Sequence, residues 1–117
     1  MDELKSRLLK VIKDSKKLSG YTLDVNVDEK IGEIQRLFTE IVGNRRYEST
    51  NYDNAYMDLK NSFSGVMYKK EEILKRISEI NIDTVDFDDS EKEGTKELSM
   101  LLKYYNELVS RERELEL

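Results

Sequence analysis

The sequence predicts an all-α fold, an antiparallel four-helix bundle in which the third and fourth helices form a long hairpin. Apolar residues recur every three or four positions in four separate stretches, which is the period of helices that bury one face. Pro is absent, only five Gly occur, and 38% of the residues are charged, as is typical of long helices with a solvated face. At 117 residues the chain has room for one core. We therefore expect residues 1–117 to form a single helical domain, with helices at about 3–19, 29–44, 51–81 and 91–114.

The first helix is expected over residues 3–19, with Asp2 as its N-cap and Gly20 as its stop. Its apolar residues share one face, and lysines occupy the opposite one. Residues 1–20 carry six basic and three acidic groups, whereas residues 83–117 carry five and eleven. Opposite charges of this kind attract, so the first and last helices are expected to be neighbours in the bundle.

The next stretch, residues 21–27, alternates apolar and polar residues, which is a strand pattern. We expect an extended connector whose Leu23 and Val25 close the end of the bundle, and a short two-stranded pairing is the alternative. Asp28 then caps the second helix. Gly43-Asn44 ends that helix.

The third helix, residues 51–81, is the element around which the chain is organised. Its apolar residues repeat every 3.5 positions and form a seam made of Tyr52, Tyr56, Leu59, Phe63, Val66, Ile73, Ile77 and Ile80. A helix with this repeat must pack its seam against other helices. Lys70 occupies the one polar position in the seam, either as a snorkelling side chain or as a device that fixes the register of pairing. Ser62, Ser64 and Gly65 mark a close approach of another backbone or a kink.

The fourth helix follows an acidic loop and begins at a Ser90–Glu93 capping box. Its last residues, about 112–117, lack apolar partners and are expected to fray. Tyr104 and Tyr105 lie about 100° apart on the helix, so both cannot face one core. We expect Tyr104 to be offered to solvent or to a partner, because amphipathic rings are enriched at interfaces.

The acidic loop contains a partial calcium-binding pattern. Asp86, Asp88, Ser90 and Glu97 occupy positions 1, 3, 5 and 12 of an EF-hand loop. However, Glu91 stands at position 6, where Gly is needed for the turn. Helix capping explains these residues without a metal, so no metal or other cofactor is expected, and calcium binding stays an open alternative.

The composition argues against an enzyme. His and Cys are both absent, which removes the commonest general base, the commonest transition-metal ligand and all thiol chemistry. The sequence also has no Gly-rich phosphate loop and no nucleophile elbow. We therefore predict no catalytic residues.

One alternative function is nucleic-acid binding by a small helical regulator. Arg45, Arg46 and Tyr47, followed by Tyr52 and Tyr56, interleave positive charge with aromatic rings, as single-strand binders do. Two arginines are a small footprint on a chain of net charge −5, and the two seam tyrosines suit a helix interface. Nucleic acid is therefore not the expected partner.

In size and helical-hairpin content, the chain resembles the small helical proteins that carry a Trp-x-Gly turn and the helical partners of type VII secretion toxins. The Trp-x-Gly turn is missing, and the Tyr-x-x-x-Glu sequence from Tyr68 to Glu72 lies in the middle of the chain. The resemblance therefore implies a shape class and assigns no role to any residue. A small helical partner of a type VII-like secreted protein is a second alternative.

The leading hypothesis is a non-enzymatic helical interaction protein, which would be an adaptor, an inhibitor or a chaperone-like subunit. It would bind a helical partner or a second copy through the third and fourth helices. The candidate contact residues are Tyr52, Tyr56, Lys70, Tyr104, Arg45, Arg46 and Tyr47. No apolar run approaches the length of a membrane span, and the N-terminus lacks a Sec signal pattern. We expect a cytoplasmic protein that does not enter membranes, and a non-Sec export route stays open.

Overall fold

The computed structural model describes residues 2–18, 27–43, 52–63, 69–89 and 91–116. These residues are helical with short turns and contain no strand, so the all-α prediction is confirmed. The described part of the chain holds five α-helices and a short 3-10 helix, rather than the four helices expected. The elements are α1 (Asp2–Leu18), α2 (Val27–Val42), α3 (Tyr52–Asn61), α4 (Lys69–Glu79), η1 (Ile82–Thr84) and α5 (Glu93–Glu116).

The predicted single helix over residues 51–81 is wrong, because it is divided into α3 and α4. The end of α3 is closed by Ser62, whose hydroxyl donates to the Leu59 carbonyl at 2.6 Å. Arg76 of α4 donates to the Ser62 hydroxyl at 2.6 Å and to the Ser62 carbonyl at 3.0 Å. Serine side chains compete in this way with helical hydrogen bonds, and a cation is favourable at a helix C-terminus. Ser62, the described part of the Ser62–Gly65 sequence signal, therefore marks a helix end, and Ser64 and Gly65 lie outside the described residues.

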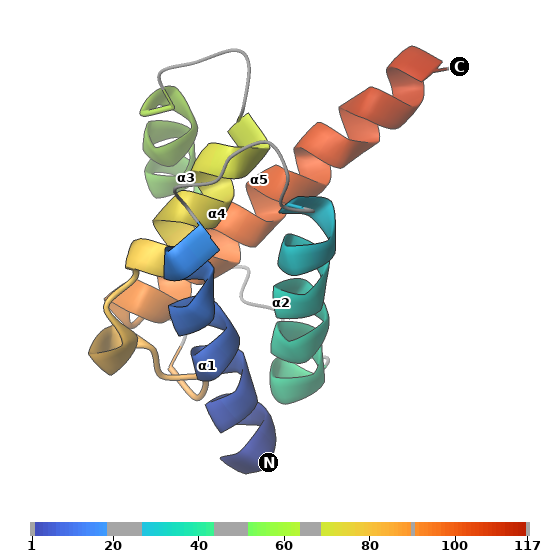
Figure 1. Ribbon diagram of the computed structural model, residues 1–117. Helices are drawn as coiled ribbons and strands as arrows, with labels where there is room; N and C mark the ends of the chain where they lie inside the picture. The colour runs from blue at the N-terminus through green and yellow to red at the C-terminus, as the bar shows by residue number, and fades with distance from the viewer. Residues whose placement is uncertain (1, 19–26, 44–51, 64–68, 90, 117) are drawn as a thin grey trace.

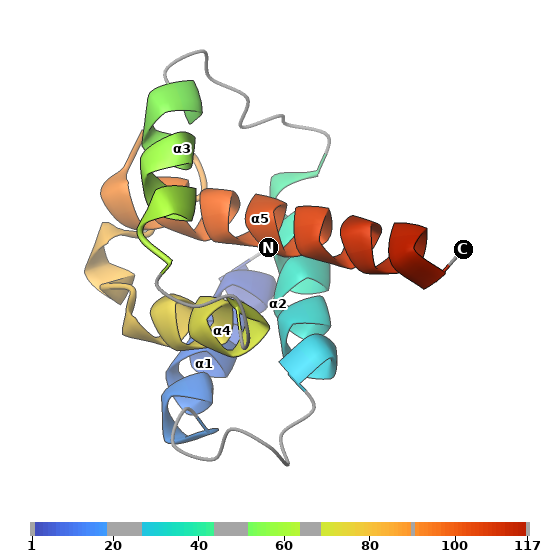
Figure 2. The same cartoon turned by 90° about the horizontal axis from the view of Figure 1, so that it is seen from above.

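The helices α1 and α2 run side by side in opposite directions, and α4 packs against both (Figure 1). On its other side α4 packs against α5, which also contacts η1. Helix α3 packs against α5 and lies across it (Figure 2). As a result, α3 and α4 reach different parts of the molecule, which one continuous helix could not do.

The hydrophobic core contains residues from all five α-helices. Its fully buried aliphatic residues come from the predicted apolar faces and are Leu8, Ile12, Ile31, Ile34, Leu37, Ile73, Ile77, Leu98 and Leu101. Burying one such side chain contributes about 1.5–3 kcal/mol. The helical periodicity in the sequence therefore identified the buried face of α1, α2, α4 and α5, even though it gave the wrong length for the third element.

The helix ends lie close to the predicted ones. Gly43 has a φ of +62°, and its N–H donates to the Thr39 carbonyl at 2.8 Å, so the stop after α2 is confirmed. Helix α2 begins at Val27 rather than at 29, which places Asp28 inside its first turn. Helix α5 begins at Glu93, two residues after the predicted start. The connector residues Leu23 and Val25 and the capping residue Ser90 lie outside the described residues.

Candidate interaction surface on the C-terminal helix

The longest described helix, α5, continues past the body of the molecule. It has 24 residues and is therefore about 36 Å long. Its C-terminal turns project away from the other helices in both views (Figures 1 and 2). Residues 110–114 are all exposed, and we call this segment the α5 tip. The helix continues to Glu116, and the fraying expected at 112–117 stays a prediction.

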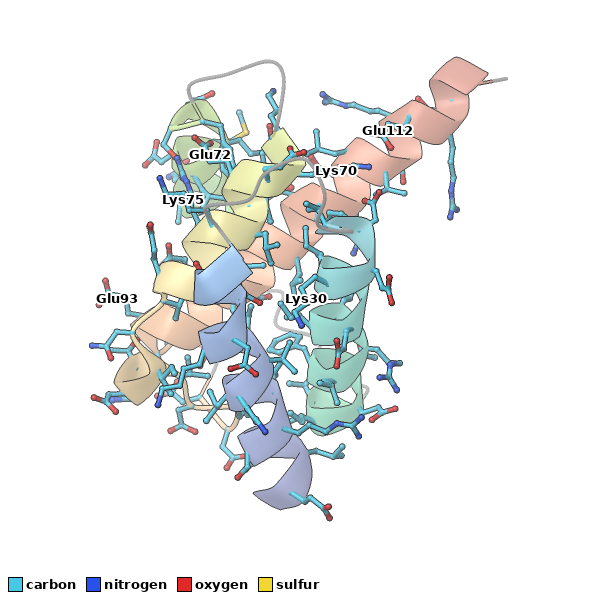
Figure 3. All side chains as sticks on the ribbon, viewed as in Figure 1. Lys30, Lys70, Glu72, Lys75, Glu93 and Glu112 are labelled. Atoms are coloured by element: carbon cyan, nitrogen blue, oxygen red, sulfur yellow. The ribbon has the colours of Figure 1, made fainter. Side chains whose placement is uncertain are left out.

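A polar junction contacts α5 at Tyr105 and at Glu112, the second of which belongs to the α5 tip. Lys70 lies in the first turn of α4. Its Nζ atom is 3.0 Å from Asp28 Oδ1 and 2.8 Å from Glu112 Oε2. The Tyr105 hydroxyl donates to Asp28 Oδ1 at 2.8 Å. Figure 3 shows Lys70 and Glu112 on the neighbouring helices. The start of α2, the start of α4 and the C-terminal half of α5 are thus joined by one lysine.

The junction favours the charged forms of Asp28 and Lys70 and the protonated, neutral form of Tyr105. Burial alone would raise the pKa of Asp28, but hydrogen bonds from Tyr105 and Lys70 outweigh it and lower that pKa. Burial would lower the pKa of Lys70, but its two carboxylate partners raise it. Burial and the hydrogen bond to Asp28 raise the pKa of Tyr105 to about 12. Lys70 is therefore anchored within the chain, and its predicted role in partner binding or register stays a prediction.

A second polar cluster joins α3 to α5. Lys60 lies 3.0 Å from Glu107 Oε2 and 5.0 Å from the centre of the Tyr56 ring, and Lys103 lies 4.6 Å from the same ring. Tyr56 is buried, and its hydroxyl has no hydrogen-bond partner of ordinary geometry among the described residues. Burial, followed by the neighbouring Glu107 carboxylate, raises its pKa. Tyr56 therefore contributes to the contact between α3 and α5 within the chain.

The expectation that Tyr104 is exposed is wrong. Tyr104 and Tyr105 are both buried, at 3% and 7% exposure. Tyr105 faces the Lys70 junction, whereas Tyr104 meets the ring of Phe63 edge to face, with centroids 5.0 Å apart. The end of the α3 segment thus covers the face of α5 that carries Tyr104. Two adjacent rings can both be buried because α5 has helices on two sides.

The other predicted contact residues are not placed by the structure. Arg45, Arg46 and Tyr47 lie outside the described residues. Tyr52 begins α3, but its side chain lies outside the described set as well. The candidate nucleic-acid patch therefore stays a sequence-based prediction, and the structure gives no geometry for it.

The carboxylates of the acidic loop serve its backbone turns. Asp86 Oδ1 accepts from the Asp88 N–H at 3.0 Å, and Asp89 Oδ1 accepts from the Glu91 N–H at 3.0 Å. Across the ranges that the structure describes, no group of three or more acidic side chains is placed to hold a metal ion. These contacts explain the sequence pattern by turn chemistry, and calcium binding is untested.

Two residues that sequence reasoning missed fix the base of α5. The buried Thr95 hydroxyl accepts from the Asp86 N–H at 2.6 Å and donates to the Asp86 carbonyl at 2.9 Å. Beside it, Gly94 packs so closely against η1 that an added Cβ would overlap Thr84 Oγ1 and lie 2.9 Å from the Thr84 carbonyl carbon. The sequence signal that could have identified Gly94 is its position in the first turn of a helix. Glycine weakens a helix, so its presence there indicates close packing.

The body and the tip of α5 therefore differ in character, since the body is packed on two sides and the tip is exposed. Of the described helices, none has the length and apolar character required to cross a membrane. Comparisons of the chain with protein-family models, with curated proteins and with solved structures give no significant match.

Proposed function

We propose that the protein is a non-enzymatic helical protein–protein interaction module, acting as an adaptor, an inhibitor or a chaperone-like subunit. Its contact surface is the α5 tip, in place of the tyrosine seam that the sequence favoured. Tyr56 of the seam and Tyr104 of α5 are buried inside the chain, so neither ring is offered to a partner without a rearrangement.

The observation that supports this proposal is the exposed run of residues 110–114 at the end of α5, which projects from the other helices (Figures 1 and 2). Isolated helical turns are only marginally stable in water, because most helix stability in proteins comes from packing. The anchor at Lys70 and Glu112 holds the tip in a defined direction. An exposed helix end that is already helical before binding can bind another helix at a smaller ordering cost than a disordered segment.

The chemistry of the site supports binding rather than catalysis. His and Cys are absent from the chain, which leaves carboxylates, lysines and tyrosines as the titratable groups. Asp28 and Lys70 are paired with each other, and Glu107 is paired with Lys60. The pairs lower the pKa of Asp28 and Glu107 and raise that of Lys70, and so move these three groups away from the pKa near neutrality that suits proton transfer.

Site-specific photo-crosslinking tests the proposal. A photoreactive residue replaces Ser110 in the full-length chain, expressed in the organism that produces it, and Glu40, exposed on α2, is replaced as the matched control. We expect a discrete cross-linked adduct from position 110 and none from position 40. Equal labelling from both positions, or no adduct from either, would overturn the proposal.

A further inference from the structure

We propose that the partner of the α5 tip is a second copy of this chain, bound with the two tips antiparallel. The inference rests on the proposed function and names the partner of the same surface. It is carried by the order of charges along the tip, which is Arg111, Glu112, Arg113 and Glu114.

When two copies of this segment lie antiparallel, each basic residue of one copy lies opposite an acidic residue of the other. Around a twofold axis that passes between positions 112 and 113, Arg111 of one copy lies opposite Glu114 of the other, and the reverse pair is equivalent. Such an isologous contact is the usual way in which two identical chains associate. A partner of a single charge sign would leave one member of each pair opposite a like charge, so the pattern favours a copy of itself.

The two residues of this pair also lie on the same side of the helix. Arg111 and Glu114 are three positions apart, so their side chains are neighbours on the helix surface. Leu108, one turn before Arg111, is only partly buried against the core. An antiparallel copy would therefore find an apolar residue beside the charge pair. Glu112, which is held by Lys70, lies on a different side of α5 and need not contribute to the contact.

The contact is small, which sets its expected strength. Stable complexes bury roughly 1,200–2,000 Å² in total, and two helix tips of about one and a half turns each bury less than that. We therefore expect a weak dimer that forms with increasing protein concentration. Because exposed ion pairs contribute to it, salt should weaken it.

Sedimentation equilibrium of the full chain over a range of concentrations tests the inference. Two charge-reversal variants are compared with the unmodified chain, first singly and then mixed. R111E alone and E114R alone each place like charges opposite one another and should raise the dimer dissociation constant at least about fivefold. An equimolar mixture of the two variants restores both opposite-charge pairs and should associate as tightly as the unmodified chain. R7E, a reversal at an exposed position of α1, should change nothing.

Thermal melting of each variant shows whether its fold is retained, which matters because Arg111 is close enough to Tyr56 to affect its pKa. The inference is overturned if the unmodified chain is monomeric at every concentration, or if the mixture associates no better than the single variants. If the Ser110 adduct then contains a different protein, the proposed function stands and only the second copy is wrong. If there is no adduct, the proposed function fails as well.

Discussion

Gly94 shows how one residue without a side chain sets the start of α5. The helix approaches η1 so closely that a Cβ at this position would lie 2.9 Å from both the Thr84 carbonyl carbon and Val85 Cγ2. Backbone cannot move aside as a flexible side chain can, so any added atom must displace the loop. Gly32 lies on an exposed part of α2, and a Cβ added there would have no neighbouring atom within 4 Å. The two glycines therefore respond to the same substitution in opposite directions.

We predict that Gly94→Ala lowers the free energy of unfolding by about 1–3 kcal/mol, because it overpacks the contact with η1. Gly32→Ala should raise it by roughly 0.5–1 kcal/mol, since alanine is the better helix former and meets open space. Urea denaturation of both variants measures the difference. Equal effects of the two substitutions would show that Gly94 is not constrained by its neighbours.

At the scale of the helices, Lys70 joins three of them. Its side chain is 20% exposed, whereas those of Asp28 and Glu112 are more than half exposed, so solvent screens both ion pairs and each contributes little. The junction instead orients α5, because Lys70 links it to the start of α2 and to α4. Both partners are far from Lys70 in sequence, and each comes from a different helix.

We predict that Lys70→Met lowers the free energy of unfolding at pH 7 by roughly 1 kcal/mol. The folded state lowers the pKa of Asp28, so the stability that Asp28 contributes is present above its unfolded pKa and is lost as the pH falls through its folded pKa. The difference between the variant and the unmodified chain should therefore shrink below about pH 4. Urea denaturation at several pH values measures it.

Lys75→Met is the control for this prediction, because Lys75 is exposed on the same helix (Figure 3). Its effect should stay within about 0.5 kcal/mol at every pH. If the loss caused by Lys70→Met persists unchanged at low pH, the Asp28 pair is not its source.

Local signals in the sequence predicted much of the fold but little of the site. The stop at Gly43 was predictable because only a residue that tolerates positive φ fits there. The end of α3 was not predictable, because it depends on a hydrogen bond from Arg76 of the following helix to Ser62. The 3.5-residue apolar repeat also continues through the break and gives no sign of it. Lys70 stood out as a polar residue in an apolar seam. Its partner Glu112 lies 42 positions away, a distance that periodicity does not address.

At the scale of the whole molecule, the described helices contribute unequally to the buried core. Helices α1, α2, α4 and α5 share the fully buried aliphatic residues of the core. Helix α3 instead packs mainly against α5, through Tyr56, the Lys60–Glu107 pair and the contact of Phe63 with Tyr104. An exposed Met57, and a buried Tyr56 hydroxyl without a hydrogen bond of ordinary geometry among the described residues, add little to this contact.

We therefore predict that α3 opens separately, before the rest of the molecule unfolds. Native-state hydrogen exchange should give the amides of residues 56–61 an opening free energy at least about 1–2 kcal/mol below that of residues 73–79 in α4, because elements with few buried apolar contacts open first. Lys60→Met, which removes the ion pair to Glu107, should speed exchange in α3 and leave α4 unchanged. If both helices instead exchange with the same dependence on urea, α3 belongs to one cooperative unit with the core. Separate opening of α3 would expose Tyr56 and Tyr104, and would so make these two rings of the predicted surface available to a partner.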